Sequence, residues 1–337
     1  MAKYLITHID LDGKMAGALA QYFNRYFDFD EILYANYGFE TLETTLKLIT
    51  PENIIWITDL SVPESTFIEW RDTLKEIRIY DHHISADGLS KHAECDMDNT
   101  RCGTRIFWED CIRPIVQSDY SEDALKKLDF LVNLTDVYDM WKTHDPLWLT
   151  STRLYRVCSL ASKVVYEGTA TYFAKRLDTL LGKDATLKFD DTETEYYTGK
   201  EKEMEDFLQK IKDEVKIQKD KRGYSFAVIP TPKTISMSLA AEALFNDNPT
   251  LDYLILWNEG LKNAMSLRSR HVNLTGLHGV FGHEFSAGVS GGGSAKDPNS
   301  KTSWLRGEMQ KLRNGGYCLS WVKDGEEKNG DIVLEEC

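Results

Sequence analysis

The chain has 337 residues and a net charge of −14, with 42% hydrophobic and 28% charged residues. This length is more than one ordinary domain needs, and it predicts two domains. The acidic balance disfavours binding to long duplex nucleic acid, which requires a basic surface. A short nucleotide needs only a few local cations, so the charge does not exclude one.

The chain carries no segment that predicts membrane insertion or export. No window approaches the ~20 consecutive apolar residues of a transmembrane helix, and the first residues, MAKYLITHID, predict a strand rather than a signal peptide. The six cysteines show neither a C-x-x-C pair nor zinc-type spacing, which indicates reduced structural thiols. We therefore expect a cytoplasmic protein with no membrane partner.

The first part of the chain alternates between predicted strands and predicted helices. The strands are expected at Lys3–Thr7, Ile32–Tyr37, Asn53–Thr58 and Glu76–Tyr80. The helices between them are expected at Met15–Phe27 and from Pro63 to about Lys75. The third strand, NIIWIT, is strongly apolar, as strands buried on both faces are. This alternation predicts an α/β fold with a doubly wound parallel sheet.

Further helices are expected at Thr104–Cys111 and Glu122–Leu134. The segment Glu201–Arg222 is highly charged, but its apolar residues recur on one face, which predicts an amphipathic helix that bridges two domains. These apolar residues are Met204, Phe207, Leu208, Ile211 and Val215.

Beyond this helix we expect a second, smaller α/β unit. Its first elements are a strand at Tyr224–Ile229, a helix around Ser236–Phe245 and a strand at Leu251–Trp257. The chain is therefore predicted to consist of a metal-binding domain at 1–189, a linker helix at 190–223 and a substrate-binding domain at 224–337.

Polar residues follow directly after four apolar segments. They are the run His8-Ile9-Asp10-Leu11-Asp12-Gly13, the single residue Asp59, the run Asp81-His82-His83, and Asp136. Three of these signals follow predicted strands, and in an open parallel sheet ligands gather beyond the carboxyl ends of the strands. We therefore expect these side chains to converge at one edge of the sheet.

In an extended chain alternate residues point to one side, so His8, Asp10 and Asp12 can converge. Carboxylates forced together disfavour one another's charge, and a divalent cation removes this penalty. Carboxylates with a few imidazoles suit Mn²⁺ or Mg²⁺. Taken alone, Asp59 could be a helix cap and D-x-D-G a turn, but a calcium loop would need further acidic positions. Together the four signals predict a metal site.

This set of motifs resembles that of the DHH phosphoesterases, with H-x-D-x-D-G, an Asp that ends a strand, D-H-H, and a later Asp at a helix. That family includes RecJ exonucleases, nano-RNases that degrade very short RNAs, and cyclic-dinucleotide phosphodiesterases. The four motifs lie in the first half of the chain. The second half resembles the DHH-associated substrate domain more loosely.

The resemblance implies two Mn²⁺ ions, with Mg²⁺ as an alternative. The residues that it implies for one ion are His8, Asp10 and Asp59. Those that it implies for the other are Asp12, Asp59, His82 and Asp136, with Asp59 as the bridge. It further implies that His83 lies near the substrate phosphate and that Asp81 orients the two histidines.

Two details of the first domain depart from the family pattern or leave a choice. Many relatives place the histidine of the first motif four residues before the Asp, whereas His8 is two residues before Asp10. In the fourth motif Asp139 is a rival of Asp136. We prefer Asp136 because Thr-Asp ends this motif in several relatives.

The resemblance also implies substrate contacts in the second domain. Arg268, in the segment SLRS, stands where relatives use an arginine to contact the substrate, and a guanidinium can bind a phosphate with two hydrogen bonds. Gly282-His283 is the best match to the Gly-Gly-Gly-His loop of relatives, although two of its glycines are replaced. The backbone of such a loop can approach a phosphate closely. The run Gly291–Gly293 is a rival that lacks the histidine.

These observations predict a metal-dependent phosphodiesterase of nano-RNase type, which hydrolyses short oligonucleotides, dinucleotides or 3′,5′-bisphosphorylated adenosine. A cyclic-dinucleotide phosphodiesterase and a single-strand exonuclease are alternatives. A pyrophosphatase and a catalytically inactive nucleotide-binding protein are alternatives of other kinds. The expected partner is a short nucleic acid or a linear or cyclic dinucleotide, and a homodimer is left open. The eight tryptophans offer surfaces on which bases can stack, but the sequence singles out none of them.

Overall fold

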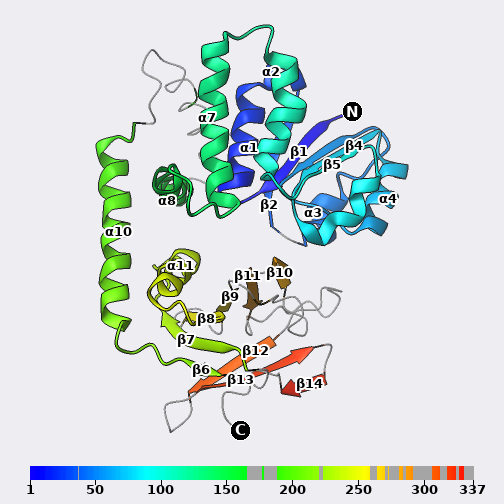
Figure 1. Ribbon diagram of the computed structural model, residues 1–337. Helices are drawn as coiled ribbons and strands as arrows, with labels where there is room; N and C mark the ends of the chain where they lie inside the picture. Colours follow the sequence, from blue (N-terminus) through cyan, green and yellow to red (C-terminus); the bar gives the residue numbers. More distant parts are fainter. Residues whose placement is uncertain are drawn as a thin grey trace. The chain divides into compact units, whose positions relative to one another are not determined.

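Figure 1 shows the computed structural model of the chain. The structure describes residues 1–36, 38–164, 177, 188–219, 223–258, 264–269, 272, 281–283, 286–290, 306–311, 317–323 and 326–329. The chain divides into two units, Met1–Thr198 and Gly199–Cys337. The division lies within helix α10 (Asp191–Ile211), inside the linker predicted at 190–223.

The first unit contains a five-stranded sheet with the order β2-β1-β3-β4-β5, in which every neighbouring pair is parallel. Its strands are β1 (Lys3–His8), β2 (Glu31–Ala35), β3 (Ile54–Thr58), β4 (Glu76–Asp81) and β5 (Cys95–Met97). The four predicted strands are all present, within two residues of their expected bounds. The strand order reverses between β1 and β3, and such a reversal is where open α/β sheets bind ligands.

Both faces of this sheet are covered, which confirms the predicted doubly wound α/β fold. On one face, Trp56 of β3 contacts the rings of Phe27 and Phe107. The next residue, Ile57, faces the opposite side, where it belongs to a buried cluster with Phe67 of α4 (Glu64–Thr73). Because its residues alternate between two cores, β3 is strongly apolar.

The helix predicted at Met15–Phe27 is divided into α1 (Leu11–Tyr22) and α2 (Asn24–Phe27). Helix α1 begins four residues earlier than predicted because Asp10 caps it, accepting a hydrogen bond from Gly13 N at 3.1 Å. The helix predicted at Glu122–Leu134 is α7 (Glu122–Asp139), which ends five residues later than predicted. The other elements of this unit are η1 (Phe39–Thr41), α3 (Glu43–Leu46), η2 (Ile84–Lys91), α5 (Gly103–Ile106), η3 (Phe107–Ile112), α6 (Arg113–Val116) and α8 (Trp148–Val164).

Helix α10 begins ten residues before the predicted start at Glu201 and ends at Ile211 rather than Arg222. It begins early because Asp190 and Glu193 each accept a hydrogen bond from the other's backbone N–H at 2.8 Å, as in a capping box. The predicted apolar face is confirmed. Phe207 and Ile211 are buried in a core cluster, against which Met204 and Leu208 pack. Val215 also packs against this cluster, but it lies beyond the end of the helix.

The second unit contains a six-stranded sheet with the order β10-β11-β9-β8-β7-β6. Its strands are β6 (Gln218–Lys219), β7 (Ser225–Thr231), β8 (Tyr253–Asn258), β9 (Ala264–Ser269), β10 (Phe281–His283) and β11 (Ser286–Ser290). Only the β7–β8 pair is parallel among the described strands of this sheet, and α11 (Met237–Asp247) connects these two strands. A separate antiparallel sheet consists of β12 (Arg306–Lys311), β13 (Tyr317–Lys323) and β14 (Glu326–Asn329). Among the described helices, none is long and apolar enough to cross a membrane.

The apolar face of α10 leads to a prediction about stability. Phe207→Ala removes a buried ring and should lower the free energy of unfolding of the second unit by about 3–5 kcal/mol. The neighbouring Asp206 is exposed, so Asp206→Ala should change it by less than about 0.5 kcal/mol. Urea unfolding followed by circular dichroism measures both values. Equal losses in the two variants would contradict the core position of Phe207.

Candidate metal centre

Three neighbouring strands deliver acidic and imidazole side chains to the same edge of the first sheet. Strand β1 ends at His8, Asp59 directly follows β3, and β4 ends at Asp81, which His82 and His83 follow. These strands are adjacent and parallel, so their carboxyl ends share one edge. This edge includes the reversal of strand order between β1 and β3.

One group of candidate ligands surrounds His8. Its Nδ1 lies 2.9 Å from Asp10 Oδ2 and 3.5 Å from Asp59 Oδ2, and the ligand atoms of these three residues lie within 4.8 Å of one another. Burial opposes ionisation of Asp10, but the hydrogen bond with His8 outweighs it and holds the pKa of this carboxyl below its usual range. Burial likewise lowers the pKa of His8, yet Asp10 raises it overall. A cation bound here would replace the proton that the pair otherwise shares.

A second group surrounds His82. Its Nε2 lies 3.3 Å from Asp139 Oδ2, 3.4 Å from Asp59 Oδ1 and 4.0 Å from Asp12 Oδ2. Asp12, His82 and Asp139 again place their ligand atoms within 4.8 Å of one another. Burial, followed by the neighbouring His83, lowers the pKa of His82, which favours the neutral imidazole that metals bind.

A third group joins the first two. Its ligand atoms likewise lie within 4.8 Å of one another, and they come from Asp59, Asp81, His82 and His83. Asp59 and His82 therefore each belong to two groups. His83 Nδ1 lies 2.6 Å from Asp81 Oδ1. Burial lowers the pKa of His83, but the charge of Asp81 outweighs burial and raises it overall. The Asp81 contact therefore orients His83 and favours its protonated form.

The electrostatics of the site fit a divalent cation. Asp59 Oδ2, Asp81 Oδ2 and Asp139 Oδ2 are buried and have no hydrogen-bond partner among the described residues. Burial raises the pKa of Asp59 well above its usual range, and the nearby carboxylates, with Asp10 first, add to this effect. Burial and then Asp12 do the same for Asp139. Crowded carboxylates with imidazoles are a donor set for Mn²⁺ or Mg²⁺, which would offset this repulsion.

The backbone of Asp59 is strained. Its φ of +53° lies in the left-handed region, which few non-glycine residues adopt. Asp tolerates this conformation better than most residues do. Strain of this kind clusters at functional sites, where it fixes a side chain in a required direction. Here the Asp59 carboxylate points toward both His8 and His82.

Asp12 is held by the start of helix α5. Its two carboxylate oxygens accept hydrogen bonds from Gly103 N at 2.7 Å and Thr104 N at 2.9 Å, and its carbonyl oxygen accepts one from Thr104 Oγ1 at 2.5 Å. Gly103 is also packed directly on Asp59. Neither Gly103 nor Thr104 was predicted as a site residue, because no local pattern indicates a contact with Asp12, about 90 positions earlier in the chain.

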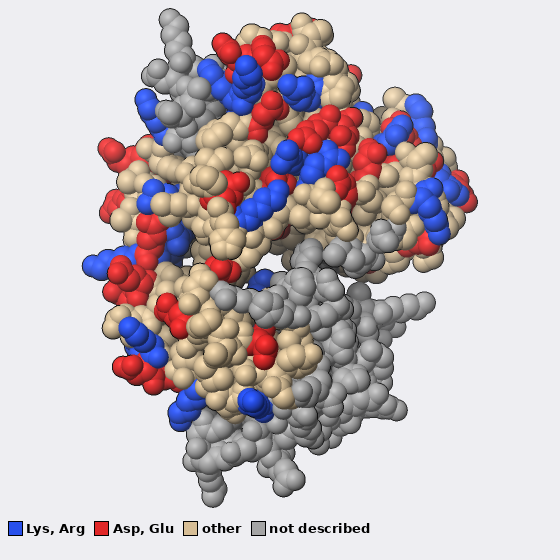
Figure 2. Space-filling view, in the orientation of Figure 1, with Lys and Arg blue, Asp and Glu red and all other residues tan. Residues whose placement is uncertain are grey.

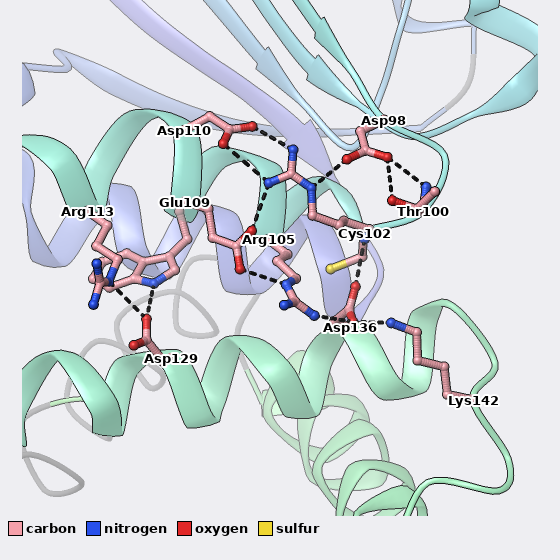
Figure 3. A network of polar contacts seen from close by, with 12 residues as sticks. Asp98, Thr100, Cys102, Arg105, Glu109, Asp110, Arg113, Asp129, Asp136 and Lys142 are labelled. Atoms are coloured by element: carbon pink, nitrogen blue, oxygen red, sulfur yellow. Dashed lines mark hydrogen bonds and ion pairs between the residues drawn. The ribbon is translucent and has the colours of Figure 1, made fainter.

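The structure does not bring Asp136 into these ligand groups. Asp136 is fully buried, and its oxygens accept hydrogen bonds from Cys102 N at 2.9 Å, from Arg105 Nη1 at 3.0 Å and from Lys142 Nζ. Figure 3 shows its carboxylate between Arg105 and Lys142. Asp139, one turn further along α7, is grouped with Asp12 and His82 instead. The geometry thus groups Asp139, rather than Asp136, with Asp12 and His82, because two cations and an amide already surround the Asp136 carboxylate. Which of the two binds a metal ion stays a prediction.

In the second unit, the predicted substrate residues lie in one sheet. Arg268 lies in β9, and its Nε donates a hydrogen bond to Ser266 Oγ at 3.0 Å. Arg268 is in register with Ser286 of β11, which is in register with His283 of β10. The backbone at Gly282-His283 is thus a strand rather than a loop. The rival run Gly291–Gly293 lies outside the described residues.

No family model and no curated protein sequence matches the chain, but solved structures do. The DHH domain of a member of a family of ribosomal proteins has a TM-score of 0.55 at 13% identity, over 85% of this chain and 82% of that one. RecJ from Thermus thermophilus, solved in complex with Mn²⁺, has a TM-score of 0.50 at 15% identity. That match covers 99% of this chain, which spans only 64% of the RecJ chain. The chain therefore has the fold of DHH-domain proteins.

The close packing of Gly103 on Asp59 leads to a second prediction. A Cβ at position 103 would lie 2.8 Å from Asp59 Cα, and this backbone cannot yield as a flexible side chain would. Gly103→Ala should displace Asp59 or the amides that hold Asp12, and it should weaken Mn²⁺ binding by about 10-fold or more. Isothermal titration calorimetry measures this affinity. Gly199→Ala is the matched control, because its Cβ would have no neighbour within 4 Å; equal affinities in the two variants would contradict the prediction.

Proposed function

We propose that this protein is a metal-dependent phosphoesterase that hydrolyses phosphodiester bonds in short nucleotides. The observation that carries this proposal is the overlap of three ligand groups through Asp59 and His82. Two ions that share ligands in this way suit phosphodiester hydrolysis, because they can stabilise the attacking and leaving oxygens together. The DHH-domain fold supports the same function.

We propose two Mn²⁺ ions, for which Mg²⁺ is an alternative. The proposed ligands of one ion are His8, Asp10 and Asp59. The proposed ligands of the other are Asp12, Asp59, His82 and Asp139, with Asp139 in place of Asp136. Bound ions of this kind supply Lewis acidity toward the phosphoryl group and lower the pKa of water.

The protein's own residues have further roles in this proposal. His83 is buried, and its contact with Asp81 favours the protonated ring. A protonated imidazole can donate a hydrogen bond to a phosphoryl oxygen, where negative charge develops during hydrolysis. Asp81 acts by orienting His83. In the second unit, Arg268, Gly282 and His283 stay the proposed substrate-binding residues. Arg268 and His283 are both in register with Ser286 of β11, and Gly282 lies one position from that register.

Charge favours a short substrate over a long one. The net charge is −14, and Figure 2 shows acidic and basic side chains interspersed over the described part of the visible face, without a continuous basic surface. Long nucleic acid is held through many phosphate contacts that need such a surface. We therefore propose short oligonucleotides or dinucleotides as substrates. A single-strand exonuclease activity is the second candidate, because RecJ, which shares the fold, is solved with Mn²⁺.

Hydrolysis of a substrate panel tests this function. The purified protein is incubated with Mn²⁺ and a linear dinucleotide, a cyclic dinucleotide, adenosine 3′,5′-bisphosphate, pyrophosphate or single-stranded DNA. We expect the linear dinucleotide to be cleaved fastest, with activity lost in EDTA and in Asp59→Asn. Asn tolerates the left-handed backbone of Asp59, and it removes the charge and one of the two oxygens at nearly constant size. Cleavage of none of the substrates would overturn the enzymatic proposal, and a preference for single-stranded DNA would favour the second candidate.

The choice between Asp139 and Asp136 leads to a further prediction. Asp139→Asn replaces one of several crowded carboxylates, so it should raise the melting temperature of the metal-free protein while weakening Mn²⁺ binding by at least about 10-fold. Asp136→Asn keeps an oxygen for Cys102 N but removes the charge opposite two cations. It should destabilise the metal-free protein by about 1–3 kcal/mol.

Thermal unfolding in EDTA and calorimetric titration with Mn²⁺ measure both effects. The two variants form a matched pair, because they carry the same substitution on one helix, α7. Loss of Mn²⁺ binding in Asp136→Asn, with normal binding in Asp139→Asn, would return the ligand role to Asp136.

A further inference from the structure

Helix α7 ends with an unusual residue at its C-terminal turn. Lys142 N donates a hydrogen bond to Val137 O at 2.9 Å, and Trp141 N donates one to Tyr138 O at 3.2 Å. This pattern is a Schellman motif, whose left-handed residue is usually glycine. Here it is Trp141, with a φ of +52°. A bulky residue in this conformation is a genuine outlier, and it costs conformational free energy that glycine would not.

Trp141 belongs to a group of four aromatic rings. Its ring lies 5.0 Å from that of Trp148 at 74° and 5.7 Å from that of Tyr138 at 62°. Tyr138 in turn stacks nearly parallel to Trp148 and Tyr155, at 12° and 15°. Tyr138 is almost fully buried, whereas Trp141, Trp148 and Tyr155 are half-buried. The group therefore has a supported inner ring and three rings that reach the surface.

One residue of this aromatic group lies close in the chain to a candidate metal ligand. Trp141 follows Asp139 by two residues, so the two Cα atoms are separated by about 7 Å or less. The carboxylate of Asp139 belongs to the ligand group of Asp12 and His82. The left-handed turn therefore holds a tryptophan next to a candidate metal ligand. Backbone strain of this kind clusters at binding and active sites, which indicates a functional role for the indole.

We propose that Trp141, supported by Trp148 and Tyr138, is a stacking surface for a nucleobase of the substrate. This inference rests on the proposed function and adds to it that the substrate is recognised through a base next to the bond that is cleaved. Any base can stack on an indole, so the contact selects nucleotides without selecting sequence. Stacking also suits an acidic protein, because it does not depend on many phosphate contacts.

Trp141→Gly is the variant that tests this proposal. Glycine suits the left-handed position, so the backbone strain disappears together with the ring. Asp28→Gly is the matched control, because Asp28 also has a left-handed φ of +52° at the end of a helix, α2, and is exposed. The probes are adenosine 5′-monophosphate and ribose 5-phosphate, titrated calorimetrically in the presence of Mn²⁺.

We expect the native protein and Asp28→Gly to bind adenosine 5′-monophosphate more tightly than ribose 5-phosphate, by about 5-fold to 100-fold. In Trp141→Gly this preference should disappear, while the affinity for ribose 5-phosphate and for Mn²⁺ is unchanged. A preference that survives in Trp141→Gly, or its absence from the native protein, would overturn the stacking proposal. An equal loss of affinity for both probes would assign Trp141 a packing role and would overturn it too.

The binding experiment is independent of turnover, so it separates this proposal from the proposed function. If the native protein cleaves a linear dinucleotide, Trp141→Gly should raise KM by about 5-fold or more and leave kcat within about 2-fold. If the native protein cleaves nothing but the base preference depends on Trp141, the stacking surface stands and the enzymatic proposal fails. If the native protein cleaves the dinucleotide and Trp141→Gly leaves KM unchanged, the enzymatic proposal stands and the stacking proposal fails.

Discussion

The mutual repulsion of crowded carboxylates is the constraint on which the first unit depends. Asp12 and Asp59 are buried, and the inward carboxylate oxygen of Asp139 is buried beside them. Burial and mutual repulsion both raise the pKa values of Asp59 and Asp139. A folded protein can tolerate such a cluster only if a cation offsets it or if the surroundings hold it in place. The first unit offers both. Its imidazoles can bind metal ions together with the carboxylates, and a rigid set of backbone N–H donors holds carboxylates in place.

The rigid part is centred on the start of helix α5. Cys102 N donates to Asp136, and the next two backbone amides donate to Asp12. Arg105 and Lys142 neutralise Asp136, so this carboxylate serves as an anchor while Asp139 stays with the cluster. Gly103 fits only because it has no side chain, since a Cβ would collide with Asp59. The fold thus brings together α1, the end of β3, α5 and α7, so a change in any of these elements affects the same carboxylates.

The site and the charge of the protein favour the same kind of substrate. An acidic protein without a continuous basic surface does not hold long nucleic acid well, but a compact cluster of ions can bind a single phosphodiester. The strained Trp141, two residues after Asp139, adds an aromatic surface on which a base could stack. Among the described non-glycine residues with a left-handed backbone, Asp59 belongs to the cluster and Trp141 follows the candidate ligand Asp139 by two residues, whereas Asp28 ends helix α2. Recognition would then come from one phosphate and one base rather than from a long contact surface.

The sequence by itself determined the strand positions, the parallel sheet and the edge where the polar residues gather, because alternation and strand-end position are local signals. The amphipathic face of α10 was predictable for the same reason. Only the tertiary structure distinguishes Asp136 from Asp139, which lie on one helix and differ in what faces them. It also decided the roles of Gly103 and Trp141, because close packing on Asp59 and a left-handed backbone depend on contacts between distant segments that no local pattern records.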